Sequence, residues 1–279
     1  MHVRKWVFAA AVSAALSICS ISFAGDISGT AKLDGPAPEQ KPIDMSGVQQ
    51  CQDMHPDPVM EENVVANDKG MLANVVVSVK KEDSPDLTGD CPKDPAVIDQ
   101  SGCQYKPHVI AMMGGQDFVV KNSDNFLHNI HTLSEKNPSF NKAQPNKNDG
   151  EKMQDPPKVP EYFHVKCDVH PWMSAYVAVF DHPFFGVSGA DGKWTIKNLP
   201  DGDYTLHAWH EKLGEQDKKV TIKDGKPSEE IVFTFKPDAA AMAPQTTDAI
   251  FASSTGDKDK ANCPACCAMP SKAAAITGK

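Results

Sequence analysis

The stretch Cys167-Asp-Val-His170-Pro-Trp-Met173, together with His128 upstream of it, decides the fold that we predict for this chain. These residues offer one thiol, two imidazoles and one thioether. Two histidines, one cysteine and a weak axial methionine are the ligands of electron-transfer copper centres. The sequence therefore predicts one mononuclear copper ion, bound by His128, Cys167, His170 and Met173.

The spacing of these residues suits an electron carrier better than an enzyme. A loop this short brings Cys167, His170 and Met173 to one side of an ion, so His128 must reach the ion from a different strand. A catalytic metal keeps one position open for water or substrate, and the sequence offers no obvious further group for a substrate. We therefore expect that the chain is not an enzyme.

Residues 122–129, Asn-Ser-Asp-Asn-Phe-Leu-His-Asn, followed by Cys-x2-His-x2-Met, resemble the plastocyanin and amicyanin branch of the cupredoxins. The resemblance covers residues 100–181, and the joint pattern is specific. It implies a Greek-key β-sandwich with a blue, type 1 copper site. It also implies that Asn129 joins the two ligand loops by hydrogen bonds, and that His170 lies at the protein surface as the exit for the electron.

Two simpler interpretations of the motif remain open. Cys167 and His170 could be half of a zinc site, although a structural zinc needs a second pair of ligands and none lies near. Cys167 could also be a small buried hydrophobic residue. Period-two alternation in 161–167 places Phe163, Val165 and Cys167 on one apolar face, where a dry copper site would lie.

The other histidines are weaker candidates for ligands. By the same alternation, His131 and His164 point away from the predicted site. His207, His210 and Glu211 could form a second metal site, but the two histidines lie on opposite faces of the predicted strand. We therefore expect one metal centre.

Short β-type runs separated by Asp-Gly and Gly-Gly turn signals fill the chain, and helical periodicity is nearly absent. This pattern predicts an all-β fold of the sandwich type. Residues 132–160 are rich in Lys, Asn and Pro, which indicates a surface excursion or a flexible loop. The predicted strands are 75–79, 109–112, 118–120, 176–180, 194–196, 204–209, 220–222 and 231–235.

A second domain is indicated by Gly189-Ala-Asp-Gly-Lys-Trp-Thr-Ile and Leu199-Pro-Asp-Gly-Asp-Tyr-Thr-Leu. These motifs resemble the carboxypeptidase regulatory-like domain, which implies a small prealbumin-like β-sandwich without catalytic activity of its own. Pieces that resemble the early strands of that family lie far upstream, at 27–33 and 72–79.

We therefore predict a discontinuous regulatory-like domain, residues 25–90 and 182–236, interrupted by a cupredoxin domain at residues 91–181. The competing architecture gives residues 25–181 to a long cupredoxin. It leaves 182–236 as a companion that is short for an independent core.

The two ends of the chain differ from the middle. Residues 1–24 combine basic residues, an apolar run and a small-x-small site, which predicts a signal peptide and a periplasmic or secreted protein. No later apolar stretch is long enough to span a bilayer. Residues 237–279 lack periodicity and are predicted to be disordered. Their Cys263, Cys266 and Cys267 could bind Cu(I) or form a local disulfide.

Net charge and cysteine usage restrict the partners and the compartment. The net charge of −9, which becomes more negative without the signal peptide, argues against nucleic acid and favours a basic redox partner such as a cytochrome. Cys51, Cys91 and Cys103 are an odd set that should contain one disulfide. We favour Cys51 with Cys103, because Cys91 lies in a loop rich in Pro and Asp.

Two functions are compatible with these features. The first is electron transfer by cycling between Cu(I) and Cu(II). The second is copper storage, resistance or delivery, which would use the same site together with the cysteine-rich tail.

Overall fold

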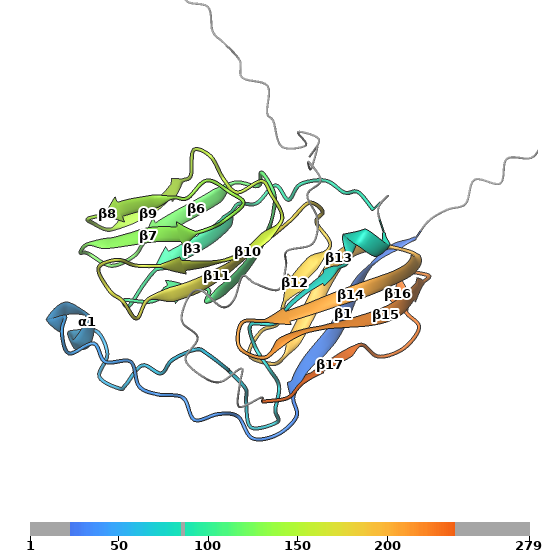
Figure 1. Cartoon of the computed structure of the whole chain (residues 1–279), viewed down its shortest axis with the longest axis horizontal. Helices are drawn as coiled ribbons and strands as arrows, with labels where there is room; N and C mark the ends of the chain where they lie inside the picture. Colours follow the sequence, from blue (N-terminus) through green and yellow to red (C-terminus); the bar gives the residue numbers. More distant parts are fainter. Residues whose placement is uncertain (1–22, 85–86, 238–279) are drawn as a thin grey trace, which may run out of the picture.

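A computed structural model describes residues 23–84 and 87–237 of the 279-residue chain. Figure 1 shows an almost wholly β protein in which two sandwiches lie side by side. The prediction of an all-β fold is confirmed. The predicted signal peptide and tail lie outside the described residues except for their inner ends, Phe23 to Ala24 and Pro237. In the described part, no helix is long and apolar enough to cross a membrane.

The first sandwich has one sheet of order β4-β3-β6-β9 and one of order β5-β11-β10-β7-β8. The pairs β3 with β6 and β5 with β11 are parallel, and the other pairs are antiparallel. Inward side chains of the two sheets form its core, among them Ile98, Phe118, Ile130 and Phe163. Its strands are β3 (Ala96–Gln100), β4 (Tyr105–Lys106), β5 (Val109–Met113), β6 (Phe118–Asn122), β7 (His128–Leu133), β8 (Asn141–Gln144), β9 (Asn148–Lys152), β10 (Glu161–Lys166) and β11 (Ser174–Phe180).

The second sandwich has one sheet of order β13-β1-β17 and one of order β12-β2-β14-β15-β16. Trp194, which is 1% exposed, and Phe233 lie in its core. Its strands are β1 (Ala24–Leu33), β2 (Val76–Val79), β12 (Phe185–Val187), β13 (Lys193–Pro200), β14 (Gly202–His210), β15 (Gly214–Lys223), β16 (Lys226–Pro227) and β17 (Val232–Phe235); the 3-10 helix η1 (Lys81–Asp83) follows β2.

Two separate stretches of the chain form the second sandwich. Strands β1 and β2 precede β3–β11 in the sequence, and β12–β17 follow them, yet β1 pairs with β13 and with β17, and β2 pairs with β14. This order of strands is the one that an interrupted domain requires. The domain boundaries, and the relation of this sandwich to the carboxypeptidase regulatory-like family, stay predictions.

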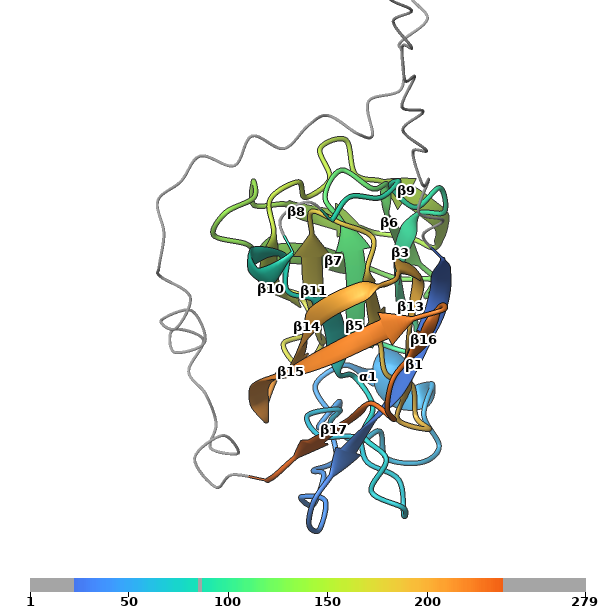
Figure 2. The ribbon, with the colours of Figure 1, turned by 90° about the vertical axis from the view of Figure 1, so that its right-hand side faces the viewer.

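The two sandwiches touch through a cluster of apolar side chains. Val76 of β2 and Val109 of β5 are buried together with Tyr176 and Phe180 of β11, and Trp209 of β14 packs against them. Figure 2 shows β14 in front of β5 and β11. All four residues of β2 are buried because one face of this strand meets its own core and the other meets the first sandwich.

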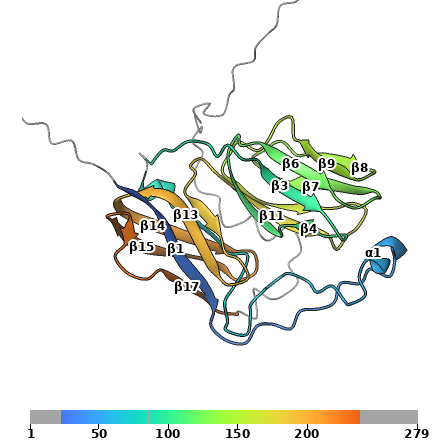
Figure 3. The ribbon, with the colours of Figure 1, turned by 180° about the vertical axis from the view of Figure 1, so that it is seen from behind.

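A long connection between β1 and β2 crosses to the first sandwich. Its middle, residues 42–60, contains helix α1 (Gln49–Asp53) and is closed at its base by a bridge between Pro42 and Met60. We call residues 42–60 the cover segment. Figures 1 and 3 agree that α1 lies on the side of the first sandwich away from the second. A disulfide joins Cys51 of α1 to Cys103, as predicted.

Residues 132–160 are more regular than their composition indicates. They contain β8, which pairs with β7, and β9, which pairs with β6. The segment lies at the surface as predicted, because four of the five residues of β9 are exposed. The alternative of a flexible loop is wrong, because β8 and β9 are paired strands. Backbone pairing with a neighbouring strand needs no apolar side chains, so composition did not reveal it.

Candidate metal centre

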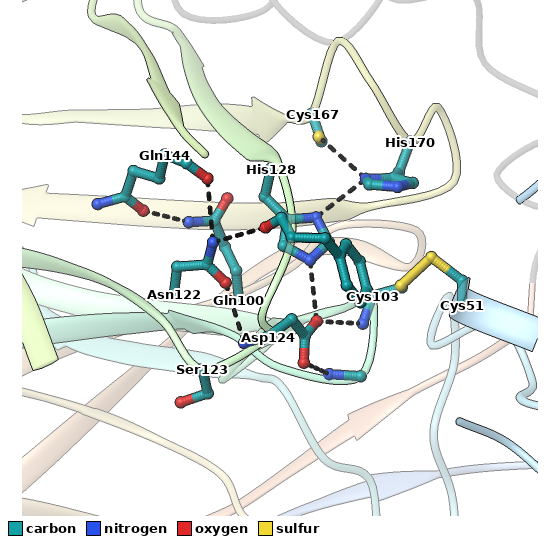
Figure 4. A network of polar contacts seen from close by, with 12 residues as sticks. Cys51, Gln100, Cys103, Asn122, Ser123, Asp124, His128, Gln144, Cys167 and His170 are labelled. Atoms are coloured by element: carbon teal, nitrogen blue, oxygen red, sulfur yellow. Dashed lines mark hydrogen bonds and ion pairs between the residues drawn. A yellow bond between two sulfur atoms is a disulfide. The ribbon is translucent and has the colours of Figure 1, made fainter. Parts of the chain in front are cut away.

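The predicted ligands come from two places at one end of the first sandwich. His128 is the first residue of β7, and Cys167 directly follows β10, while His170 and Met173 lie in the loop that leads to β11. All four are buried, with exposed fractions of 0%, 2%, 2% and 1% in chain order. The structure thus brings the residues of both motifs into one dry region, which Figure 4 shows in close-up for the thiol and the two imidazoles.

The donor atoms of three residues converge. One ring nitrogen of His128, one of His170 and the thiol sulfur of Cys167 lie within 4.8 Å of one another. The Nδ1 atoms of the two histidines are 2.9 Å apart, and the sulfur is 3.7 Å from Nδ1 of His170. Two imidazole nitrogens and a soft sulfur that face one small volume suit a transition metal, and this donor set suits copper.

The loop that carries three of the predicted ligands is closed by its own backbone. The Cys167 N–H donates to the Met173 carbonyl at 3.3 Å, and the Met173 N–H donates to the His170 carbonyl at 3.0 Å. Met173 packs in the same core as Cys167. Its role as a fourth ligand stays a prediction.

Asn129 connects the two ligand segments, as the resemblance implies. Its Oδ1 accepts the Asp168 N–H at 2.6 Å and the Cys167 thiol at 3.3 Å. Its Nδ2 donates to Asn141 at 2.8 Å. His131 lies outside this region, with Nδ1 3.1 Å from Asp168, and His164 contacts Ser174 instead of the site. Both orientations agree with the alternation in the sequence.

The electrostatic environment favours the thiolate. Burial raises the pKa of the Cys167 thiol, but the hydrogen bonds with His128 and His170 outweigh burial and lower that pKa to about 5. Burial lowers the pKa of His128, whereas its contacts with Asp124 and Cys167 raise it more. Because the thiolate is the form of cysteine that binds metals, the lowered pKa of Cys167 favours metal binding.

The expectation that His170 lies at the surface is wrong. Its exposed fraction is 2%, and the Cys51 sulfur of the cover segment lies, with that of Cys103, within 4.8 Å of a His170 ring nitrogen. Phe126 and Trp172 flank the ring, with centroid distances of 6.2 and 5.3 Å. A segment more than a hundred residues upstream thus covers the face that the resemblance would leave open.

The sequence also gave no role to Asp124, which lies four residues before His128. Its Oδ2 is 2.9 Å from Nε2 of His128, on the side of the ring opposite Nδ1. Burial raises the pKa of Asp124, but hydrogen bonds with His128 and with the backbone of Cys103 and Gly102 lower it more. The only available signal was an aspartate inside the motif that precedes His128.

The second metal site considered near Trp209 is not formed. His207 is directed to Asp217 at 2.7 Å and Glu215 at 3.5 Å, whereas His210 is buried on the other face of β14. Among residues 23–84 and 87–237, the groups that could hold a metal all lie around the copper motif.

Comparison with known proteins yields likenesses to solved structures alone. No protein-family model matches the chain, and no curated protein matches it. The copper-containing nitrite reductase of Thermus scotoductus SA-01 is 20% identical over 31% of this chain and 22% of its own, with a TM-score of 0.27.

Two smaller proteins match a similar share of this chain. A purple cupredoxin from Nitrosopumilus maritimus is 21% identical over 30% of this chain and 99% of its own, with a TM-score of 0.26. A Cu(I) amicyanin variant is 17% identical over 31% of this chain and 82% of its own, with a TM-score of 0.27. At these scores the likenesses carry no argument about function, which has to rest on the site itself.

Proposed function

We propose that this protein is an electron carrier with one mononuclear, type 1 copper ion held by His128, Cys167, His170 and Met173. The observation that carries the proposal is the convergence of the Cys167 sulfur and two imidazole nitrogens within 4.8 Å of one another in a buried site. Thiolate and imidazole donors, with a thioether nearby, are the ligands of electron-transfer copper. No enzymatic activity is proposed.

When bound, copper would supply one-electron chemistry between Cu(I) and Cu(II). The residues of the chain have two tasks in that scheme. The closed loop from Cys167 to Met173 and the Asn129 bridge hold the donors in fixed positions, which limits reorganisation when the charge of the site changes. Burial of all four predicted ligands excludes water, which would otherwise exchange on the metal.

We place this carrier in the periplasm or outside the cell. The Cys51–Cys103 disulfide supports this placement because disulfides persist mainly in oxidising compartments. We also propose that the partner is a basic redox protein such as a cytochrome, and not a nucleic acid. The net charge of −9 supports it because opposite charges accelerate encounter.

The test is a visible absorption and spin-resonance spectrum of the protein with Cu(II), beside the variants Cys167→Ser and His131→Gln. We expect an intense red absorption band that Cys167→Ser abolishes. His131→Gln should leave the band unchanged, because this histidine lies close to the centre but faces Asp168. A colourless Cu(II) protein, or a copper signal that survives Cys167→Ser, would rule out the proposal and favour a zinc or purely structural role.

Burial of His170 under the cover segment favours a second candidate function, copper storage or delivery. A carrier benefits from a ligand near the surface, whereas a store benefits from a sealed site. Transfer of Cu(I) to a chelator at a rate that falls when Cys263, Cys266 and Cys267 are replaced would support delivery. Those three cysteines lie outside the described residues. Reversible one-electron cycling with little metal loss would support the carrier.

A further inference from the structure

Outside its four predicted ligands, the centre has a buried contact between His128 and the carboxylate of Asp124. We propose that Asp124 is a positioning residue of the copper site, whose carboxylate fixes the tautomer of His128 and favours Cu(II) over Cu(I). This inference rests on the proposed function, since it concerns the same site. It assigns a role to a residue that is not itself a predicted ligand.

The carboxylate of Asp124 is buried, and both of its oxygens have hydrogen-bond partners. Asp124 is 3% exposed. Its Oδ1 accepts the Gly102 N–H at 2.8 Å, and its Oδ2 accepts the Cys103 N–H at 2.9 Å and faces Nε2 of His128 at 2.9 Å. Three donors therefore surround one carboxylate, which can only accept when it is ionised.

The turn that supplies the two backbone donors is shaped for an anion. Gly102 and Cys103 both have positive φ, +66° and +54°, a conformation that non-glycine residues such as Cys103 rarely adopt. Successive N–H groups of such a turn point into one concavity, which is a recurrent way to hold an anion. The Cys51–Cys103 disulfide fastens this turn to the cover segment. The position of the carboxylate is thus set by elements that do not depend on His128.

The geometry decides which nitrogen of His128 carries the proton. A neutral imidazole has one donor and one acceptor nitrogen, and the bond made by one nitrogen sets the state of the other. Because Nε2 faces a carboxylate, it is the donor, so Nδ1 is the nitrogen that can offer a lone pair to a metal ion beside Cys167 and His170. Metal-binding histidines are commonly oriented in this way by a carboxylate.

The two histidines differ in this respect. The described hydrogen bonds of His170 involve Nδ1, which faces His128 and Cys167, and no described carboxylate contacts its ring. Of the two histidines, His128 is therefore the one whose ring orientation is set by a carboxylate. A buried negative charge next to His128 also attracts the more highly charged ion more strongly. Asp124 should lower the reduction potential for this reason.

The main test compares Asp124→Asn with a control, Asp117→Asn, which removes a carboxylate at the protein surface, where Asp117 contacts Lys152. Asparagine keeps the shape of Asp124 but not its charge. We expect Cu(II) affinity to fall at least tenfold relative to Cu(I) affinity, so the potential rises by about 59 mV or more. The control should leave the potential nearly unchanged. An Asp124→Asn protein with native circular dichroism and an unchanged potential would overturn the proposal.

A second measurement does not depend on the variant folding or on copper. Nitrogen-15 NMR of histidine side chains in the metal-free wild-type protein reports which ring nitrogen of His128 carries hydrogen. We expect hydrogen on Nε2, bonded to Asp124. An Nε2 of His128 without hydrogen would refute the positioning role. A colourless Cu(II) protein with the expected NMR signals would refute only the proposed function.

Discussion

Single residues connect the two segments that supply the ligands. Asn129 is 5% exposed and uses both ends of its amide: Oδ1 accepts from Asp168 and Cys167, and Nδ2 donates to Asn141. Its backbone lies in β7, whereas Asp168 and Cys167 follow β10. The side chain therefore fixes the separation of His128 from the loop that contains His170.

Replacement of Asn129 by alanine should destabilise the metal-free protein. The change leaves the partly buried Asp168 N–H without its acceptor, and because an unsatisfied buried donor costs about 1–3 kcal/mol, we expect a loss near the lower end of that range, about 1 kcal/mol. The free energy of unfolding in urea measures the effect. Asn141→Ala is the control, because Asn141 is exposed and its loss should cost about 0.5 kcal/mol or less. Equal losses for the two variants would contradict the bridging role of Asn129.

For single residues, the sequence correctly predicted the features that follow from local patterns such as strand alternation. Alternation along β10 placed Cys167 on the buried face, and the structure agrees, with Phe163 and Val165 beside it. Proximity of His128 to His170 followed from a resemblance between motifs. The role of Asp124 did not follow, because its carboxylate is recognised by backbone N–H groups of a turn formed by Gly102 and Cys103, and backbone donors leave no trace in residue identity.

Among the elements, the cover segment has the largest effect on the site. Its apolar residues Ile43, Met45 and Val48 pack with Phe126 and Trp172, which flank His170. The Trp172 indole N–H donates to the Cys103 carbonyl at 3.1 Å. This small cluster, a contact of 2.8 Å between Nε2 of His55 and the Gly102 carbonyl, and one disulfide hold the segment. The disulfide is the covalent link among them, so it should have the largest effect on how tightly the segment closes.

The double variant Cys51→Ser and Cys103→Ser should loosen the cover. The disulfide spans 52 residues, and the entropy of closing a loop of that length corresponds to about 4 kcal/mol. We expect a loss of that order in the free energy of unfolding, together with faster hydrogen exchange in residues 42–60 and not in β10. Exchange that accelerates equally in both segments would show that the disulfide stabilises the whole sandwich and not the cover.

Strands were easier to predict than the path of the chain between them. The eight predicted strands all occur, because β-branched and aromatic runs bounded by turns are local signals. The cover segment has no such run, and its position depends on contacts between Cys51 and Cys103, which are far apart in the sequence. The pairing of the two cysteines was predicted, but its position beside His170 was not, and for this reason we expected an exposed His170 where the structure buries it.

At the scale of the whole molecule, the copper motif and the second sandwich are joined through a buried polar contact. His108 precedes β5, and Glu211 follows β14 of the second sandwich. Nε2 of His108 is bonded to the Glu211 carboxylate, and Nδ1 donates to the Ser174 carbonyl at 3.2 Å. Both ring nitrogens face acceptors, which favours the doubly protonated, charged form of His108. Ser174 directly follows Met173, so this contact reaches the ligand loop.

The pH dependence of stability should report this contact. Burial lowers the pKa of His108, but the hydrogen bond and charge of Glu211 raise it above the ordinary value of about 6.5. A group whose pKa is higher in the folded than in the unfolded state makes its full contribution to the free energy of unfolding at pH values below the unfolded pKa. That contribution is lost as the pH rises through the folded pKa. The other charged or titratable groups near the pair are Glu62, His164, Tyr176, His210 and Lys212.

Glu211→Gln should therefore cost most at low pH. Below a pH of about 6.5 it leaves the buried His108 cation without its partner, and we expect a loss of about 3 kcal/mol in the free energy of unfolding. Above the folded pKa of His108 the ring is neutral in both proteins, so the difference should shrink. Glu215→Gln is the control, because this exposed carboxylate contacts only the partly exposed His207. A difference that stays constant or grows with rising pH would mean that His108 is neutral in the folded protein.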